Sequence, residues 1–335
     1  RSWFTNSRTR ENFSIKLSMD ILKYLCGIAV LFFWACEPEE QPIPDEWKKL
    51  ENFASIEAQM PLGENYESQI FYSLERAEVV KKVSKMEWDF AWNGDSSIIL
   101  NSGRNMKAVS TNFSEFSQVN IEDFIELKWD WCMGNPDSFA MSPLQFQVVY
   151  VVDLGTDLAN NPIGKAKVLL EKISNDSLFF IIDWNGQVQE QSMVRDVKFN
   201  FVSFSILNNQ QVDIEPPKTM YDLKFTQYIN YFEEEETDYL VVGALQNPYK
   251  TEALKIVDEV YETSTIKPML SKKWDAIGYD WKRFDFGLAR YIIEEDRYYQ
   301  IKTQNDKYFK LRFTSFTDEN NVKGYPKFIF QEMLK

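Results

Sequence analysis

The chain has 335 residues and no histidine, and its 37 basic and 51 acidic residues give a formal net charge of −14. Without histidine it lacks Ser-His-Asp and Cys-His nucleophile systems, an imidazole general base and histidine metal ligands. Its negative charge opposes binding to phosphate backbones, so we set DNA and RNA binding aside. The composition favours a protein that binds a ligand over an enzyme.

The N-terminal part of the chain is typical of a targeting segment. Residues 1–18 are polar and precede the first methionine, so we interpret them as upstream or non-native sequence. Residues 19–35 then carry Lys23 and an apolar run, which is too short to span a bilayer and suits a signal peptide. A small residue before Cys36 resembles a lipobox. We predict lipidation of Cys36, the alternatives being a plain secretory signal or an uncleaved anchor.

Residues 36–50 are acidic and rich in proline, which predicts a solvated tether between the membrane and a folded body. An acidic run directly after the lipidated cysteine resembles the surface-export signal of lipoproteins in the Bacteroidota. We therefore expect a surface-exposed protein of the bacterial outer membrane, held there only by its lipid. Cleavage before Cys36 would leave 32 basic and 49 acidic residues, a net charge of −17. Cys132 would have no intramolecular partner, so no disulfide is predicted.

Residues 51–335 form the predicted body. They are rich in aromatic residues, which favour strands, and apolar and polar residues alternate along 202–206 and 309–314. Turn-forming pairs with asparagine separate the runs. The pattern predicts an all-β antiparallel sandwich, with short helices at 45–53 and 114–124.

The sequence resembles itself at an interval of 133 residues. Two pairs of aromatic segments share one spacing: 71–74 with 88–92, and 204–207 with 221–225. Each pair continues into a further apolar strand. We predict a duplicated β-meander with units at about 54–200 and 201–335, the alternative being two unrelated aromatic hairpins.

One aspartate follows an aromatic residue at the same place in each unit. Asp89 follows Trp88, and Asp222 follows Tyr221. We expect both carboxylates to accept backbone N–H groups of an adjacent turn rather than to act in catalysis.

Several motifs resemble those of a known family. They are Glu64–Tyr66, Gln69–Leu74, Glu87–Trp92, Ser97–Asn101, Lys273–Asp275, Tyr291–Ile293, Asp306–Phe313 and Gly324–Phe330. Together they resemble the HmuY family of haem-binding lipoproteins of the Bacteroidota, over 54–110 and 220–330. Residues 120–200 resemble the expansion of a longer subfamily.

The resemblance implies an all-β protein that captures haem for a TonB-dependent receptor of the outer membrane. Family members ligate the iron through two axial side chains, histidine in some and methionine in others. This chain has no histidine, and the family's C-terminal ligand position falls near Tyr279, where no methionine stands. Any haem ligand must therefore be methionine, tyrosine, cysteine or a carboxylate.

Four residues are candidate ligand-binding residues. Tyr279 could supply a phenolate and Trp281 a stacking wall, and we rank this pair before the thioethers of Met133 and Met141. The alternatives are strand packing for the first two and core filling for the methionines. A phenolate would favour ferric iron, whereas a thioether would favour ferrous iron.

Other polar clusters indicate loops rather than sites. Asp153, Asp157, Asn160 and Asn161 miss the EF-hand spacing, and Glu233–Glu236 indicates a charged loop. The predicted function is capture of haem or a related tetrapyrrole for an outer-membrane transporter. A carbohydrate-binding or protein-docking module that uses stacking aromatic residues is the alternative.

Overall fold

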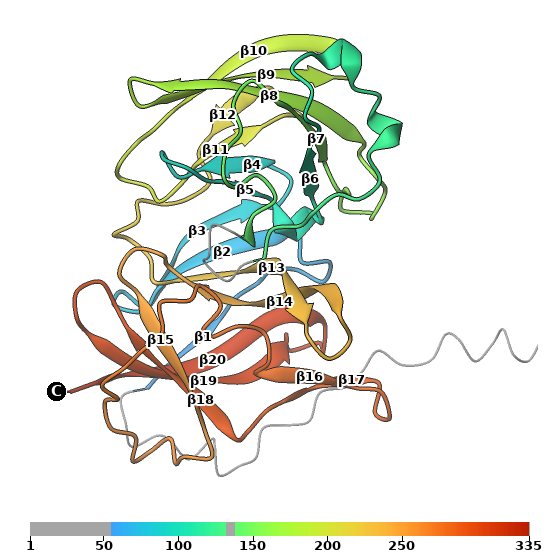
Figure 1. The fold of residues 1–335 in the computed structure, drawn as a ribbon. Helices are drawn as coiled ribbons and strands as arrows, with labels where there is room; N and C mark the ends of the chain where they lie inside the picture. The colour runs from blue at the N-terminus through green and yellow to red at the C-terminus, as the bar shows by residue number, and fades with distance from the viewer. Residues whose placement is uncertain (1–54, 132–137, 335) are drawn as a thin grey trace, which may run out of the picture.

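The computed structural model describes residues 55–131 and 138–334 (Figure 1). Regular structure in these ranges consists of β-strands and short 3₁₀ turns, and the strands form antiparallel sheets. The predicted all-β class is confirmed. Cys36, the tether, Met133 and the helix expected at 45–53 lie outside the described residues. No helix within them is long and apolar enough to cross a membrane.

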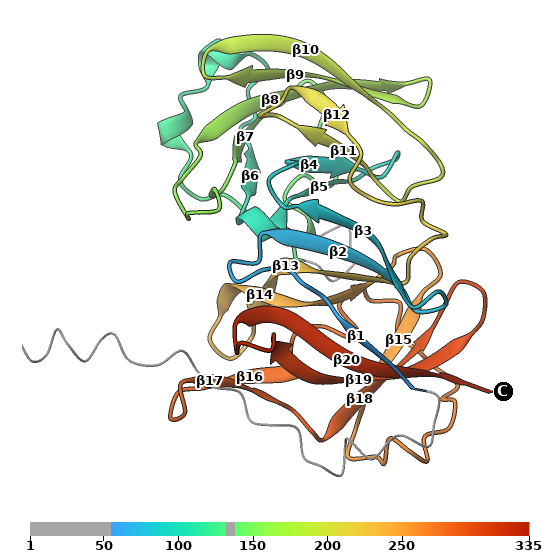
Figure 2. The same cartoon turned by 180° about the vertical axis from the view of Figure 1, so that it is seen from behind.

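The sheets stack in layers along the long axis of the molecule, as both views show (Figures 1 and 2). The lowest layer in Figure 1 is a five-stranded sheet beside a two-stranded hairpin. In spatial order its strands are β1 (Ile56–Gln59), β20 (Lys323–Met333), β19 (Tyr308–Thr317), β18 (Arg297–Lys302) and β15 (Glu252–Val257). The hairpin consists of β16 (Lys282–Asp285) and β17 (Arg290–Ile293).

The alternation predicted along 309–314 is present in β19. Phe309, Leu311 and Phe313 lie in the lower core. The polar residues between them are also largely covered, because Lys310 and Arg312 lie over the ring of Tyr261 at 4.5 and 4.6 Å from its centroid. A covering loop thus buries a face that the alternation predicted to be solvated.

The uppermost layer is also a five-stranded sheet, and four of its strands lie within residues 120–200. Its strands are β10 (Gln187–Val194), β9 (Ser177–Trp184), β8 (Lys165–Ser174), β7 (Val149–Asp153) and β6 (Lys107–Ser110). The helix predicted at 114–124 is only two 3₁₀ turns, Phe116–Gln118 and Ile121–Asp123. Each turn ends in extended backbone, and its apolar residues pack against β7. Tertiary contact therefore replaces the longer helix.

Two four-stranded sheets form the middle layers. One contains β14 (Thr237–Gln246), β13 (Leu223–Phe232), β2 (Ser68–Ser73) and β3 (Glu78–Ser84). The other contains β12 (Gln210–Val212), β11 (Val202–Ser205), β4 (Phe90–Trp92) and β5 (Ile98–Leu100). Each sheet therefore combines one hairpin from each predicted unit, because β2 pairs with β13 and β4 pairs with β11.

Hydrogen bonds repeat between the two units. Asp89 Oδ2 accepts the backbone N–H of Ile206 at 2.6 Å, and Asp222 Oδ2 accepts that of Leu74 at 2.8 Å. Both aspartates thus hold the turn after a strand of the other unit, as expected. The equivalent turn residues Leu74 and Ile206 are 132 positions apart rather than 133, so the predicted alignment of the first strands was wrong by one residue.

A pair of asparagines extends this equivalence. Asn101 donates its side-chain N–H groups to the carbonyls of Lys85 and Trp88, at 2.7 and 2.9 Å. Asn247 makes the same contacts with Lys218 and Tyr221, at 2.7 and 2.8 Å. The matched bonds support the duplicated β-meander.

Candidate ligand-binding cavity

A cavity lies between the two middle sheets and takes its walls from both units. Successive side chains of the central strands point to opposite faces of each sheet. Ile70 and Tyr72 of β2 enter the lower core, whereas Phe71 between them lines the cavity. Phe90 and Trp92 of β4 enter the upper core, whereas Ala91 lines the cavity.

The second unit supplies the partners of these two residues. Lys224 on β13 is the register partner of Phe71, and Ser203 on β11 is that of Ala91. Both line the cavity. The predicted alternation of Val202–Ile206 therefore places Ser203 in the cavity wall and its apolar neighbours in the core.

Aromatic rings dominate the rest of the lining. Phe71 meets Tyr221 edge to face at a centroid separation of 5.0 Å. Trp274 lies 5.8 Å from Phe139 and 5.6 Å from Phe201. These rings come from strands and loops more than 200 residues apart along the chain. Their faces and edges suit an occupant with a flat aromatic surface.

The cavity is a slot rather than a chamber. It has a volume of about 800 Å³ when the open space at its mouth is counted, but only about 80 Å³ of this can take the centre of a water molecule. A porphyrin would therefore have to separate the walls on entering.

One cation stands in the aromatic wall. The ammonium group of Lys224 lies 5.7 Å from the ring centroid of Phe71 and 5.5 Å from that of Trp88. Trp88 is held in place by hydrogen bonds, since its Nε1 donates to Gln69 Oε1 at 3.1 Å, and Gln69 Nε2 donates to Thr226 at 3.0 Å. The cavity thus presents a positive charge over fixed aromatic rings.

Glu215 is a buried carboxylate in the lining. It accepts hydrogen bonds from the hydroxyl of Tyr221 at 2.5 Å, from Asn200 Nδ2 at 2.6 Å and from the backbone N–H of Phe201 at 2.8 Å. Burial raises its pKa, and the hydrogen bonds and nearby Lys224 oppose that rise. Both of its oxygens are therefore engaged within the wall.

Asp130 is a second buried acid in the lining. Its oxygens accept the backbone N–H groups of Leu100 and Ala140 at 2.5 and 2.6 Å. Burial raises its pKa to about 7, although the two hydrogen bonds lower it. The carboxyl thus links the end of β5 to the loop that carries Phe139.

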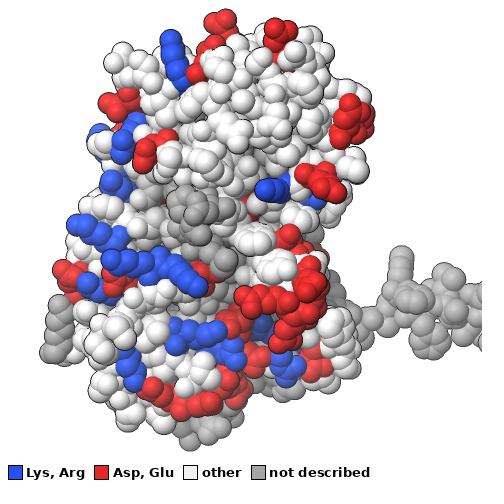
Figure 3. All heavy atoms as spheres, viewed as in Figure 1, with Lys and Arg blue, Asp and Glu red and all other residues white. Residues whose placement is uncertain are grey.

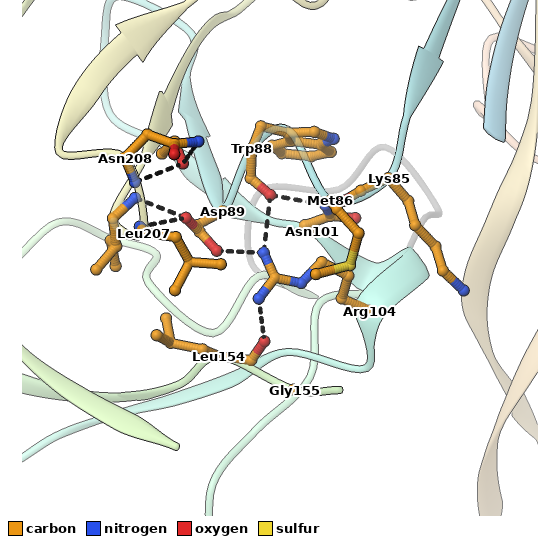
Figure 4. A network of polar contacts seen from close by, with 12 residues as sticks. Lys85, Met86, Trp88, Asp89, Asn101, Arg104, Leu154, Gly155, Leu207 and Asn208 are labelled. Atoms are coloured by element: carbon orange, nitrogen blue, oxygen red, sulfur yellow. Dashed lines mark hydrogen bonds and ion pairs between the residues drawn. The ribbon is translucent and has the colours of Figure 1, made fainter. Parts of the chain in front are cut away.

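An ion pair behind Trp88 supports this wall (Figure 4). The side chains of Arg104 and Asp89 are wholly buried and in direct contact. Arg104 also donates to the carbonyls of Trp88 at 3.3 Å and Leu154 at 2.8 Å. Asp222, which is equivalent to Asp89, accepts a hydrogen bond from the hydroxyl of Ser73 at 3.4 Å.

Of the predicted ligand-binding residues that the structure describes, Tyr279, Trp281 and Met141 do not line this cavity. Trp281 is 1% exposed, and its ring stacks on Phe313 at 3.9 Å. Met141 is 2% exposed in the upper core. Tyr279 lies beside Phe232, with ring centroids 5.5 Å apart, and its hydroxyl accepts from Asn230 at 3.4 Å. These placements favour the packing and core-filling alternatives.

The polar clusters keep the character expected of loops. Glu233–Glu236 are exposed at the turn between β13 and β14, where Figure 3 shows a dense group of acidic side chains on the right. Asp157 accepts the backbone N–H groups of Ala159 and Asn161 within its own turn, both at 2.8 Å. Among the residues that the structure describes, no group of three metal-ligating side chains is assembled.

The sequence interpretation did not identify the cavity residues as a site. Trp88 and Tyr221 belong to the repeat motif, but their positions indicated only strand packing. The usable signal was the interruption of the apolar pattern by Lys224, at a place where the other unit has Ala91. A charged residue inside a buried strand marks a wall that is not packed like a core.

Comparisons with known proteins find a family model and solved structures that are similar to this chain. The family model described as HmuY protein matches residues 65–330. A proposed HmuY-like haem-binding protein of Bacteroides vulgatus is similar, with 10% identity over 84% of this chain and 92% of that one, at a TM-score of 0.23. Apo PinO of Porphyromonas gingivitis gives 10% identity, coverages of 84% and 97%, and a TM-score of 0.24. No curated protein matches the chain.

Proposed function

Since this chain belongs to the HmuY family, we propose that the cavity between its middle sheets captures a flat ligand, haem or a related tetrapyrrole, for an outer-membrane transporter. The observation that carries the proposal is the aromatic lining that both units build around Lys224. Stacking on such rings suits a large planar ligand, and an ammonium group suits the carboxylates that tetrapyrroles carry. The family binds ligands rather than transforming them, which agrees with a chain without histidine.

Entry of a tetrapyrrole must widen the slot. Phe139 and Trp274 stand on loops rather than on the central strands, so they are the wall residues that can move most easily. The central strands, in contrast, are fixed by the cores on their far sides. We propose that the loop wall opens while the sheet walls stay in place.

We further propose that the body is tethered to the outer membrane through a lipid on Cys36. The signal-like segment before it and the acidic segment after it support this anchor. Radiolabelled palmitate should enter the wild-type protein and not the Cys36→Ala variant. Equal labelling of both would contradict the anchor.

Haemin titration of the purified chain tests the capture function. Trp274→Ala removes one stacking face at a half-buried position, and we expect it to weaken binding about tenfold, within the range of 1–3 kcal/mol for base–aromatic stacking. Trp129→Ala is the matched control, since Trp129 is also half-buried but lies outside the cavity, under Lys107. Fluorescence quenching and the visible spectrum measure both affinities.

Two results would contradict the proposal. Haemin that does not saturate the wild-type protein would favour the carbohydrate-binding or protein-docking alternative. Equal losses in Trp274→Ala and Trp129→Ala would place binding outside the cavity.

A further inference from the structure

We infer that the cavity recognises the tetrapyrrole ring and not the metal at its centre, so that a metal-free porphyrin binds as tightly as haem. This inference rests on the proposed function and concerns the chemistry of the donor atoms around the cavity. Iron in haem takes axial ligands from imidazole, thioether, thiolate or phenolate groups. The described lining offers none of these in a form ready to coordinate.

Nitrogen and sulfur ligands are missing from the described lining. The chain has no histidine, and the described cavity residues include neither methionine nor cysteine. Met141 is close in sequence to Phe139 but pairs through its backbone with Ile98 and is buried in the upper core. Turning its sulfur toward the cavity would leave a hole in that core, at a cost of about 2–5 kcal/mol for a comparable deletion.

The oxygen donors of the lining that could bind iron are engaged in hydrogen bonds or directed elsewhere. The ring of Tyr228 lines the cavity, but its hydroxyl lies toward Gly278, which is not part of the lining. Glu215 receives three hydrogen bonds, one of them from the hydroxyl of Tyr221. Asp130 receives a backbone N–H on each oxygen. A metal bond to any of these groups would break hydrogen bonds that are buried, and each unsatisfied partner costs about 1–3 kcal/mol.

Tyr279, the first choice from the sequence, does not line the cavity. Burial raises its pKa, and the carboxylates of Asp280, Glu235 and Asp275 raise it further. These neighbours oppose the phenolate form that ferric iron prefers. Its position and its charge environment both separate it from a ring held in the slot.

The contacts that remain do not depend on a metal. Phe71, Trp88, Phe201 and Trp274 offer ring faces and edges, which attract any porphyrin. Lys224 offers a positive charge to the ligand's carboxylates. Ring and carboxylates are the same in haem and in protoporphyrin IX.

Parallel fluorescence titrations of the purified chain with protoporphyrin IX and haemin test the inference. We expect the two dissociation constants to agree within about threefold, and protoporphyrin dimethyl ester, which lacks free carboxylates, to bind about tenfold more weakly. Haemin that binds more than tenfold tighter than protoporphyrin IX would overturn the inference while leaving the capture function intact. Binding of neither porphyrin would overturn the proposed function itself.

Three conservative variants locate any metal ligand. Tyr279→Phe, Met133→Leu and Cys132→Ser should leave the ratio of the two dissociation constants unchanged. A preference for haemin in the wild type that disappears in one of them would contradict the inference and identify that side chain as the ligand. Lys224→Met should weaken both porphyrins equally, with no change for the dimethyl ester; a loss confined to haemin would count against the inference.

Discussion

Asp130 couples one wall of the cavity to pH. Its buried carboxyl has a pKa of about 7, against an ordinary value of 3.8, because burial disfavours the charged form. Between these two values the folded protein binds more protons at this group than the unfolded chain does. Stability from this group is therefore present at low pH and is lost as the pH rises from about 4 to about 7.

Replacement of Asp130 by asparagine removes this dependence. The free energy of unfolding of the wild type should fall between pH 5 and pH 7, and that of Asp130→Asn should fall less. The difference between the two falls should reach up to about 3 kcal/mol, the limit for one titrating group over two pH units. Urea unfolding at both pH values measures the difference. Because Asp222 also has a raised pKa, of about 6, only the comparison of the two proteins isolates Asp130. Parallel pH profiles would show that Asp130 does not titrate in this range.

Residue roles were predictable where they depend on local chemistry. The position of Asp89 and Asp222 beside a turn predicted backbone hydrogen bonds, and both aspartates make them. The surroundings of Trp281 were not predictable, because its stacking partner Phe313 lies on a strand 32 residues away. What occupies a ring face is decided by the tertiary fold.

At the scale of elements, alternation predicted strands better than it predicted their exposure. The residues of β11 and β19 point to opposite faces as expected, yet a loop covers the polar face of β19. The helix expected at 114–124 formed only 3₁₀ turns because its apolar residues pack on β7. In both cases a segment from elsewhere in the fold packs on a sheet. The local sequence pattern of a strand or helix carries no information about such a contact.

The buried pair of Arg104 and Asp89 lies in the first unit, and Asp89 connects it to the second unit through Ile206, so its loss should be costly. Arg104→Met leaves Asp89 buried without its cation, so we expect a loss of about 3–5 kcal/mol in the free energy of unfolding. The double variant Arg104→Met/Asp89→Asn removes the uncompensated charge and should recover part of that loss. Urea denaturation of the four proteins in the cycle measures the coupling. A loss below about 1 kcal/mol in Arg104→Met would show that water or other groups compensate the carboxylate.

At the scale of the whole molecule, the cavity results from the way the two units exchange hairpins. Pairing of β2 with β13 and of β4 with β11 creates two sheets whose facing surfaces line the cavity. The outer surface of each sheet packs into a separate hydrophobic core. The repeat in the sequence predicted two similar units but not that their strands would pair with each other. The paired strands β2 and β13 are about 150 residues apart, so no local pattern could place Phe71 beside Lys224.

Hydrogen–deuterium exchange of the full chain with and without protoporphyrin IX tests most directly whether this cavity is the binding site. We expect slower exchange at two segments that border it, 213–221 and 245–248, and no change at the remote hairpin of β9 and β10. Protection confined to 275–281 around Tyr279, with unchanged exchange at both cavity segments, would contradict the account.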